Sequence, residues 1–512
     1  MKTHFKIVSL TILSLLIASC GSSTHSSINT IKIATTFSST IKDLNGTSKY
    51  ITLRTHSNNK EDKRTTDIYY SVIPAKNFAH KKEPIFYLVG GPGGSATFSM
   101  DWILKDSYFN VLLNDHDLYI VDYRGTGFSK PFANCQLNTE GTKEELKESL
   151  QTCQSIMADA NIKASDYSSQ NIATDIQQIV KAEKIDKAIF YGTSYGTRIA
   201  LTLAREYPDI VAGMILDGTF AIEANGISQA SESVLEKLYD FKKNYNTIYT
   251  DRTFEQQLKL LSQLTKTQLL NIIHHAFSNF SYIAYNYESE ENFIQMISEL
   301  KNASKEQLYT FLLTDILSNI AYIKPGAKFM NELDEIKDIS VNRKIAKIQK
   351  SHKIDSKYVS HQDGSVMSYS IILYEEYAFI EDQPLYNFGF NQTILDALDG
   401  YAGGAPLPID KLDLVSKYFK TPLPNEIEME PVSTDIPTLI FSGGRDMQTT
   451  KYWAMNTKKY LSNSQLFFFP LEGHVFSFEN KNASSIVEKF LNHLDDITLL
   501  DDIKGEDFIR EN

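Results

Sequence analysis

Residues 188–197, Ala-Ile-Phe-Tyr-Gly-Thr-Ser-Tyr-Gly-Thr, are the stretch that decides the fold of this chain. The apolar run Ala188–Tyr191 predicts a buried strand, and Thr197–Tyr207 predicts a helix. Between them, Gly192–Gly196 fits the pattern G-x-S-x-G. In so tight a strand–turn–helix connection the glycines avoid a clash, and the strained turn lifts the serine hydroxyl clear of the backbone. We therefore predict that Ser194 is a nucleophile.

Strand-like and helix-like runs alternate on both sides of this turn, which predicts an α/β fold with helices on both faces of a sheet. Several of the strand runs are continuously apolar, as expected for a mostly parallel sheet that is covered on both faces. We predict a mostly parallel, eight-stranded sheet with strands at Tyr50–Arg54, Asp67–Ile73, Pro84–Val89, Asp117–Asp122, Ala188–Tyr191, Gly213–Leu216, Pro437–Phe441 and Gln465–Phe469.

The pattern changes after Gly218. Helical periodicity dominates residues 219–434, and strand signals are weak there until Ser368–Tyr374. We interpret this stretch as a helical cap inserted between the sixth and seventh strands, where it would cover the site and select substrates. The α/β core would then consist of residues 48–218 and 435–512. A separate helical domain is the alternative, but the sheet pattern resumes afterwards and needs the later strands to complete it.

The N-terminus has the features of an export signal. Two early lysines precede an apolar run over Ile7–Ile17, which is too short for a comfortable membrane span, so we predict a signal peptide over residues 1–19. Residues 17–20, Ile-Ala-Ser-Cys, resemble a bacterial lipobox, which implies lipidation of Cys20. Residues 20–47 would be a flexible tether, and the chain an exported bacterial lipoprotein anchored to a membrane of the cell envelope. The alternative is an ordinary secretory signal with an incidental cysteine.

Composition adds two expectations. The formal net charge of −12, with acidic residues spread along the chain, argues against a nucleic-acid partner. Two cysteines, Cys135 and Cys153, follow the predicted anchor. An even number in an exported chain indicates one disulfide, whereas two free buried thiols are the alternative.

A serine nucleophile needs a histidine base and a carboxylate that orients it. Asp446 lies in a Gly-rich loop after the predicted strand Pro437–Phe441, and His474 follows the next predicted strand. Both side chains are therefore expected at the carboxyl edge of the sheet, where open α/β sheets place their sites. We predict the triad Ser194, Asp446 and His474, with Asp217 as the rival acid because it also follows a predicted strand.

The negative charge that develops on the substrate oxygen needs backbone N–H donors. One donor should be Tyr195, directly after the nucleophile, and the other should come from the loop after the third strand. That loop is glycine-rich, and we predict Gly91 as the donor, with Gly90 as the alternative. A phosphate cradle would have a lysine directly after the glycines, and this loop continues with Ser95.

Several motifs together resemble the proline iminopeptidase and tripeptidyl aminopeptidase family of α/β-hydrolases. The resemblance extends from about Ile51 to the C-terminus and is weakest in the cap, while Ile436–Tyr460 is similar to the tripeptidyl aminopeptidase branch. It implies release of N-terminal residues or short peptides through an acyl-enzyme, with no cofactor and no metal. It also implies a disulfide near Cys135 and Cys153. The motifs are Leu88–Gly94, Asp122–Ser129, Gly192–Gly196, Leu216–Gly218 and Gly473-His474.

The resemblance also guides the search for a group that binds the substrate's free α-amine. A carboxylate in a partly dry pocket suits a protonated amine. In the cap, Glu375 and Glu376 are the candidates, with Glu376 preferred. The alternative is that either is a solvated or paired surface carboxylate.

This sequence departs from the family pattern at three places. Val89 stands where a histidine often precedes the glycine-rich loop, Thr449-Thr450 where Thr-Pro is frequent, and Tyr374 where a cysteine is frequent. These departures leave the predicted triad intact and bear on the choice of substrate.

Two other functions are compatible with these motifs. An esterase or lipase would use the same triad, because the pocket and not the fold selects the substrate. A lipoprotein that binds ligands through its cap, with a vestigial hydrolase site, is a second alternative, which the complete triad argues against.

Overall fold

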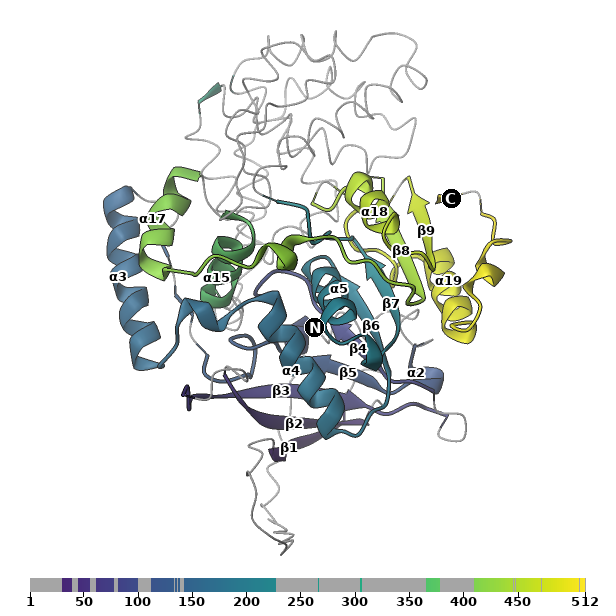
Figure 1. Ribbon diagram of the computed structural model, residues 1–512, viewed down its shortest axis with the longest axis horizontal. Coiled ribbons are helices and arrows are strands. Elements are labelled where there is room, and N and C mark those ends of the chain that lie inside the picture. Colours follow the sequence, from purple (N-terminus) through teal and green to yellow (C-terminus); the bar gives the residue numbers. More distant parts are fainter. Residues whose placement is uncertain are drawn as a thin grey trace, which may run out of the picture.

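The computed structural model describes residues 30–38, 45–55, 61–77, 82–99, 112–138, 142–226, 365–377 and 409–511, apart from isolated positions within these ranges, together with residues 266, 304 and 305. A ten-stranded sheet forms its centre, in the order β1-β2-β3-β5-β4-β6-β7-β8-β9-β10 (Figure 1). The strands are Thr30–Ser38 (β1), Asn45–Arg54 (β2), Thr65–Ile73 (β3), Ile85–Leu88 (β4), Leu118–Val121 (β5), Ala188–Thr193 (β6), Val211–Asp217 (β7), Thr438–Gly443 (β8), Ser464–Phe469 (β9) and Ile509–Glu511 (β10).

Strands β4 to β9 are parallel to one another, whereas β1, β2, β3 and β10 are joined to the sheet by antiparallel pairings. Strands β4, β6 and β8 are buried over their whole length. Such strands must be apolar on both faces, which explains the continuous hydrophobic runs in the sequence. The carboxyl ends of the parallel strands meet at one edge of this rigid core, and the candidate site lies there.

The helices of the described ranges surround this sheet. They are Leu112–Asp115 (α2), Lys143–Asp159 (α3), Ser169–Ala182 (α4), Tyr195–Glu206 (α5), Ser365–Glu375 (α15), Ile409–Phe419 (α17), Lys451–Lys458 (α18) and Lys481–Asn492 (α19). Helices α4 and α5 lie side by side over the middle of the sheet, and α5 packs against β4, β6 and β7 (Figure 1). Short 3-10 turns follow Lys163, Tyr207, Asn425 and Asp496.

All eight predicted strands are present, as β2 to β9, but the predicted count of eight is wrong because the sheet has two further edge strands. Strand β1 mixes apolar and polar residues, and β10 has only three residues, so neither has a clear hydrophobic pattern. Strand β1 and the start of β2 fall within residues 20–47, so this part of the predicted tether is sheet. The predicted signal peptide and Cys20 lie outside the described residues.

The insertion occurs between β7 and β8, which are the sixth and seventh of the predicted strands. Most of the predicted cap lies outside the described residues. The strand signal at Ser368–Tyr374 is a wrong prediction, because these residues belong to helix α15. Nearly every residue of α15 is buried, including Ile371, Ile372 and Leu373. A helix that is apolar all round has no periodicity to separate it from a buried strand.

Cys135 and Cys153 form the predicted disulfide, with 5.1 Å between their Cα atoms. The bond ties the segment after β5 to helix α3. The same segment holds the start of α15, because the backbone N–H of Cys135 donates to Oγ of Ser365 at 2.8 Å. The disulfide thus stabilises the segment that contacts the first residue of α15.

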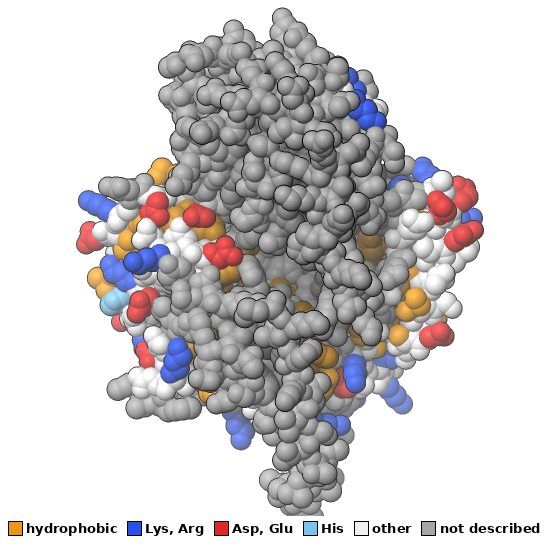
Figure 2. Space-filling view, turned by 180° about the vertical axis from the view of Figure 1, so that it is seen from behind, with side chains coloured by type: hydrophobic (Ala, Val, Ile, Leu, Met, Phe, Trp, Pro, Cys, Tyr) orange, Lys and Arg blue, Asp and Glu red, His pale blue; other side chains and the backbone are white. Residues whose placement is uncertain are grey.

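The surface of the described residues carries both charges. On the face seen in Figure 2, lysine and arginine side chains are interspersed with aspartate and glutamate. Within the described ranges, no helix combines the length and the apolar character that crossing a membrane requires.

Candidate active site

Ser194 sits in the tight turn between β6 and α5. Its backbone φ of 52° is rare for a residue with a side chain, and such strain costs about 1–3 kcal/mol. The turn is possible because its flanking residues are glycines: a Cβ on Gly196 would lie 2.0 Å from the Leu88 carbonyl oxygen, and one on Gly192 would lie 2.5 Å from that of Gly196. This geometry is the predicted elbow, in which the serine stands above the sheet.

Asp446 and His474 are joined by a hydrogen bond of 2.8 Å between Oδ2 and Nδ1. The other contacts of the carboxylate come from its own loop. Oδ1 accepts the backbone N–H groups of Gln448 and Thr449, both at 2.8 Å, and Oδ2 accepts the hydroxyl of Thr449 at 2.6 Å. Asp446 is buried and His474 is 14% exposed, so the imidazole can reach substrate while its partner is shielded from water.

The electrostatics of this pair favour the ionised carboxylate. Burial by itself would raise the pKa of Asp446, but the hydrogen bonds from His474 and Thr449 and the charge on the imidazole lower it below its ordinary value. Burial by itself would lower the pKa of His474, yet the Asp446 carboxylate outweighs burial and raises that pKa. The Asp446 carboxylate therefore stabilises the protonated imidazole of His474.

The end of β7 brings the serine and the histidine together. The backbone N–H of Ser194 donates to the carbonyl oxygen of Asp217 at 2.9 Å. At the next residue, Gly218, φ is +68° and an added Cβ would lie 3.1 Å from both Cε1 and Nδ1 of His474. Residues 217 and 218 therefore contact both the nucleophile turn and the imidazole.

Asp217, the rival acid, makes different contacts. Its Oδ2 accepts the backbone N–H groups of Phe476 and Ser477 at 3.0 and 2.8 Å and the Ser477 hydroxyl at 2.5 Å. Burial raises the pKa of Asp217 to about 6. The hydrogen bond to Nδ1 comes from Asp446, and Asp217 holds the loop that follows His474.

The glycine-rich loop after β4 contacts the nucleophile. A Cβ on Gly90 would lie 3.0 Å from Cβ of Ser194 and 3.5 Å from its Oγ, while Gly91 has φ of +132°. The phenol of Tyr123 donates to the Val89 carbonyl at 3.1 Å and fixes the start of the loop. Gly90 and Gly91, the two predicted donors, thus lie in a loop that packs next to Ser194. Only small residues at these positions let the loop come so close.

Buried Asp122 fixes the other end of this loop. It accepts the hydroxyl of Ser95 at 3.0 Å and the backbone N–H of Thr97 at 2.9 Å. Tyr195 is the first residue of α5, so its backbone N–H has no partner within the helix and is available to a substrate oxygen.

Helix α15 ends at Glu375, and Glu376 follows it; both predicted glutamates are buried but contact different segments. Glu375 accepts hydrogen bonds from Ser169 and forms an ion pair with Arg198. Oε2 of Glu376 would lie 2.8 Å from a Cβ on Gly226, and its backbone carbonyl accepts the amide of Asn225 at 2.8 Å. Glu376 therefore faces the segment that follows β7 and Gly218.

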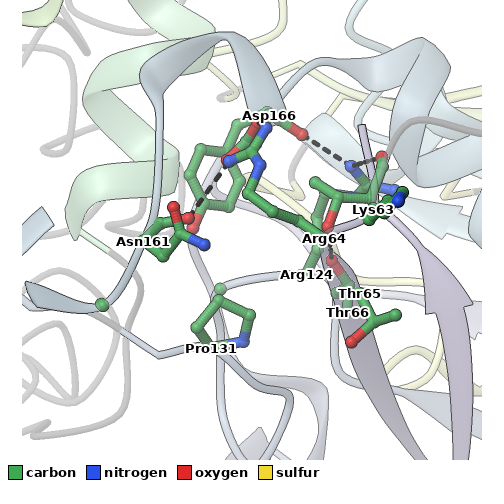
Figure 3. A pocket seen from close by; sticks show the side chains of 12 residues that line it. Lys63, Arg64, Thr65, Thr66, Arg124, Pro131, Asn161 and Asp166 are labelled. Carbon is green, nitrogen blue, oxygen red and sulfur yellow. Dashed lines mark hydrogen bonds and ion pairs between the residues drawn. The ribbon is translucent and has the colours of Figure 1, made fainter. Parts of the chain in front are cut away.

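A separate cavity of about 300 Å³ is shown in Figure 3. Its lining includes Arg64 and Arg124 but no member of the predicted triad. Arg64 points to Asp166 and pairs with it at 2.7 Å (Figure 3). Arg124 pairs with Asp175, behind the cavity lining, at 2.7 Å. Carboxylates balance both charges, so we assign this cavity a structural role. Among the described residues, no group of three or more histidine, cysteine, aspartate or glutamate side chains could hold a metal ion.

Three side chains around the site were not predicted from the sequence. In the sequence, Thr449 stands out only because the family's Thr-Pro pair is altered there. Nothing in the sequence indicates that its hydroxyl donates to the carboxylate of Asp446. Ser169 and Arg198 carry no motif, since their partners are distant in sequence and only the fold brings them together.

The fold and this constellation of residues define an α/β-hydrolase. Residues 83–268 match the α/β-hydrolase family model, and residues 415–495 match the model of TAP-like proteins. A proline iminopeptidase of Arabidopsis thaliana is 24% identical over 156 residues, which cover 30% of this chain and 32% of that protein. The serine protease Hip1 of Mycobacterium tuberculosis is 37% identical over 81 residues, 16% of this chain and 15% of that protein.

The two family models place this chain among the α/β-hydrolases with a TAP-like C-terminal part, and it is similar to proline iminopeptidases and to a serine protease. The matched region spans about a third of the length of the Arabidopsis relative. Among solved structures, a serine hydrolase of Cycloclasticus zankles aligns over 89% of this chain and 100% of its own, with a TM-score of 0.36 and 13% identity.

Proposed function

We propose that this protein is a serine aminopeptidase that releases N-terminal residues or short peptides. The observation that carries the proposal is the hydrogen-bonded pair Asp446–His474 at the carboxyl edge of the sheet, beside a strained Ser194. Peptidase relatives of the same family support a peptide substrate.

The proposed reaction has two halves, the formation of the acyl-enzyme and its hydrolysis. Ser194 Oγ attacks the carbonyl carbon, and Nε2 of His474 takes its proton while Asp446 holds Nδ1. The N–H groups of Tyr195 and Gly91 bind the oxyanion. His474 then gives the proton to the leaving amine, and a water molecule activated by the same imidazole hydrolyses the acyl-enzyme.

The free amine of the substrate would be bound by Glu376. Glu376 is buried, and its carboxylate lies close to Gly226 in the segment that follows Gly218, the residue beside the His474 imidazole. A buried carboxylate on that side can form a charge-assisted hydrogen bond with a protonated amine. Peptides with a free N-terminus are therefore the proposed substrates, and no cofactor or metal takes part in the proposed steps.

The test compares substrates that differ only at the amine. Anilides of Ala, Pro and Ala-Ala-Pro with a free N-terminus are assayed beside their N-acetylated forms and a p-nitrophenyl ester, with Ser194→Ala as the control. Cleavage that requires the free amine and is lost in Ser194→Ala supports the proposal, and Glu376→Gln should then raise KM for free-amine substrates alone. Cleavage of the ester with every anilide intact would show an esterase instead.

We also propose that Cys20 is lipidated and anchors the protein to a membrane of the cell envelope. The support is the sequence Ile-Ala-Ser-Cys after an apolar run with basic residues before it. In a bacterial host, wild-type protein should incorporate labelled palmitate and fractionate with membranes. The variant Cys20→Ser should do neither, and a labelled Cys20→Ser protein would contradict this assignment.

A further inference from the structure

Glu375 is the last residue of helix α15, and it is only 5% exposed. Its Oε1 accepts the backbone N–H of Ser169 at 2.6 Å, and its Oε2 accepts the Ser169 hydroxyl at 2.8 Å. Ser169 is the first residue of α4, where the N–H groups lack partners within the helix and attract negative charge. Glu375 therefore binds the start of α4 with both oxygens.

The hydroxyl of Ser169 links this carboxylate to Tyr195. Oγ of Ser169 lies 2.8 Å from the phenol oxygen of Tyr195. A hydroxyl has one proton, and the carboxylate can only accept, so Ser169 donates its hydrogen bond to Glu375 and accepts one from the hydroxyl of Tyr195. Burial raises the pKa of Tyr195 well above its usual value, so the phenol stays protonated and can donate this hydrogen bond. The fully buried ring of Tyr195 is thus oriented by a chain that ends at Glu375.

Arg198 forms the second link, one turn further along α5. Its Nε lies 3.2 Å from Oε2 of Glu375, and both side chains are buried. Its Nη2 donates to the carbonyl of Ile222 at 2.8 Å, and its guanidinium lies 5.1 Å from the centre of the Phe220 ring. Glu375 is thereby connected to the segment after β7 as well as to the nucleophile helix.

That segment returns to the serine. The backbone N–H of Phe220 donates to the hydroxyl of Thr197 at 2.8 Å, and this hydroxyl donates to the carbonyl of Ser194 at 2.6 Å. A single carboxylate from the insertion is therefore joined to both sides of the turn that presents Ser194 and the Tyr195 N–H.

We propose that Glu375 is a positioning residue for the oxyanion hole: through Ser169 and Arg198 it holds the first turn of α5, and with it the backbone N–H of Tyr195, in the orientation that binds the oxyanion. Because Glu375 belongs to the insertion, the packing of α15 against the core completes the catalytic geometry. The inference rests on the proposed serine-hydrolase chemistry, but it applies to any acyl substrate and does not require a free amine. Glu375 and Glu376 would then have separate roles, one in rate and the other in amine binding.

The test uses Glu375→Gln, Tyr195→Phe and the double variant, each with a free-amine anilide and with p-nitrophenyl acetate, which has no amine. Tyr195→Phe removes one buried hydroxyl and keeps the ring, so it serves as the variant that retains the fold. Losing an oxyanion donor outright costs about 100- to 1,000-fold in kcat, so a displaced donor should lower kcat about 10- to 100-fold for both substrates, with KM nearly unchanged. Reaction with a fluorophosphonate counts the competent sites in each preparation, and rates are expressed per site.

Two further readouts separate positioning from a general structural defect. The effects of Glu375→Gln and Tyr195→Phe should be strongly non-additive in the double variant, because both break one chain. A peptide aldehyde, which forms a tetrahedral adduct, should lose affinity in proportion to the loss in kcat/KM, whereas an amide competitor should not.

The outcomes are distinct. If Glu375→Gln raises KM only for the free-amine anilide and leaves kcat and ester hydrolysis intact, Glu375 binds the amine and the positioning role is wrong. If the wild type cleaves the ester but no anilide, the aminopeptidase proposal fails, yet the ester still tests the positioning role. If the wild type turns over neither substrate, the rate of fluorophosphonate labelling decides, and equal rates in wild type and Glu375→Gln overturn the inference. A wild type that is not labelled either would overturn it together with the proposed chemistry.

Discussion

Asp446 and His474 are 28 residues apart in the chain and are joined by a hydrogen bond of 2.8 Å. The two residues follow neighbouring parallel strands, β8 and β9, so the bond forms across the carboxyl edge of the sheet. It fixes the orientation of the imidazole and raises the pKa of His474. In the proposed reaction, the same bond should therefore influence both the rate and its dependence on pH.

Replacing Asp446 by asparagine should change both quantities. An amide removes the charge that stabilises the imidazolium, so kcat should fall by up to about 10,000-fold. The acid limb of the profile of kcat/KM against pH should also move to lower pH, because Asp446 is what raises the pKa of His474. The measurement is the pH profile of both enzymes with one anilide, and an acid limb that stays in place would contradict the assigned role.

Asp217 should make stability depend on pH. Burial raises its pKa from 3.8 to about 6, so between these values the folded protein keeps a proton that the unfolded chain has lost. The free energy of unfolding that this group contributes therefore falls as pH rises through that window, by about 3 kcal/mol in total. In Asp217→Asn this titration is absent.

Urea unfolding at several pH values measures this effect. The stability of the wild type relative to Asp217→Asn should decrease by about 2 kcal/mol, most of the total, between about pH 4 and pH 7. Two curves that stay parallel over this range would show that the carboxyl ionises normally in the fold.

Gly218→Ala should reduce activity through His474. The backbone there has φ of +68°, and the added methyl group would lie 3.1 Å from the imidazole and from Oγ1 of Thr449. The strained backbone should cost about 1–2 kcal/mol in stability, and displacement of the imidazole should lower kcat. Activity and thermal unfolding are measured on the same preparation.

A matched control is Gly125→Ala. This glycine also has a positive φ, of +77°, and its added Cβ would clash with Tyr167 at 2.7 Å, in the wall of the cavity in Figure 3. It should lose stability while the folded fraction keeps its kcat. Equal loss of kcat in both variants would mean that the defect at Gly218 is not specific to His474.

Removing the disulfide should destabilise the fold. The bond joins residues 18 apart, and closing a loop of that length restricts the unfolded chain by about 3 kcal/mol. The double variant Cys135→Ala/Cys153→Ala should therefore unfold at lower denaturant concentration than the oxidised wild type. Addition of a reductant should destabilise the wild type and leave the double variant unchanged; an equal response of both proteins would contradict this account.

The eight central strands and the order Ser194, Asp446, His474 could be predicted from the sequence, because strands buried on both faces are continuous apolar runs and the chemistry follows them directly. The edge strands β1 and β10 could not, since one is mixed in polarity and the other has three residues. Residues 368–374 predict a strand although they lie in helix α15, because a helix buried on all sides has no hydrophobic period.

The sequence by itself determined the fold class and singled out the candidate residues for the proposed chemistry, since both are encoded in short local patterns of apolar, glycine and polar residues. Only the tertiary structure decided which carboxylate bonds His474, what Asp217 holds, and how Glu375 and Glu376 divide between the core and the segment after β7. Those choices depend on hydrogen bonds between residues up to 260 positions apart. No local pattern records such contacts, because they form only when the sheet and helix α15 bury these polar groups together.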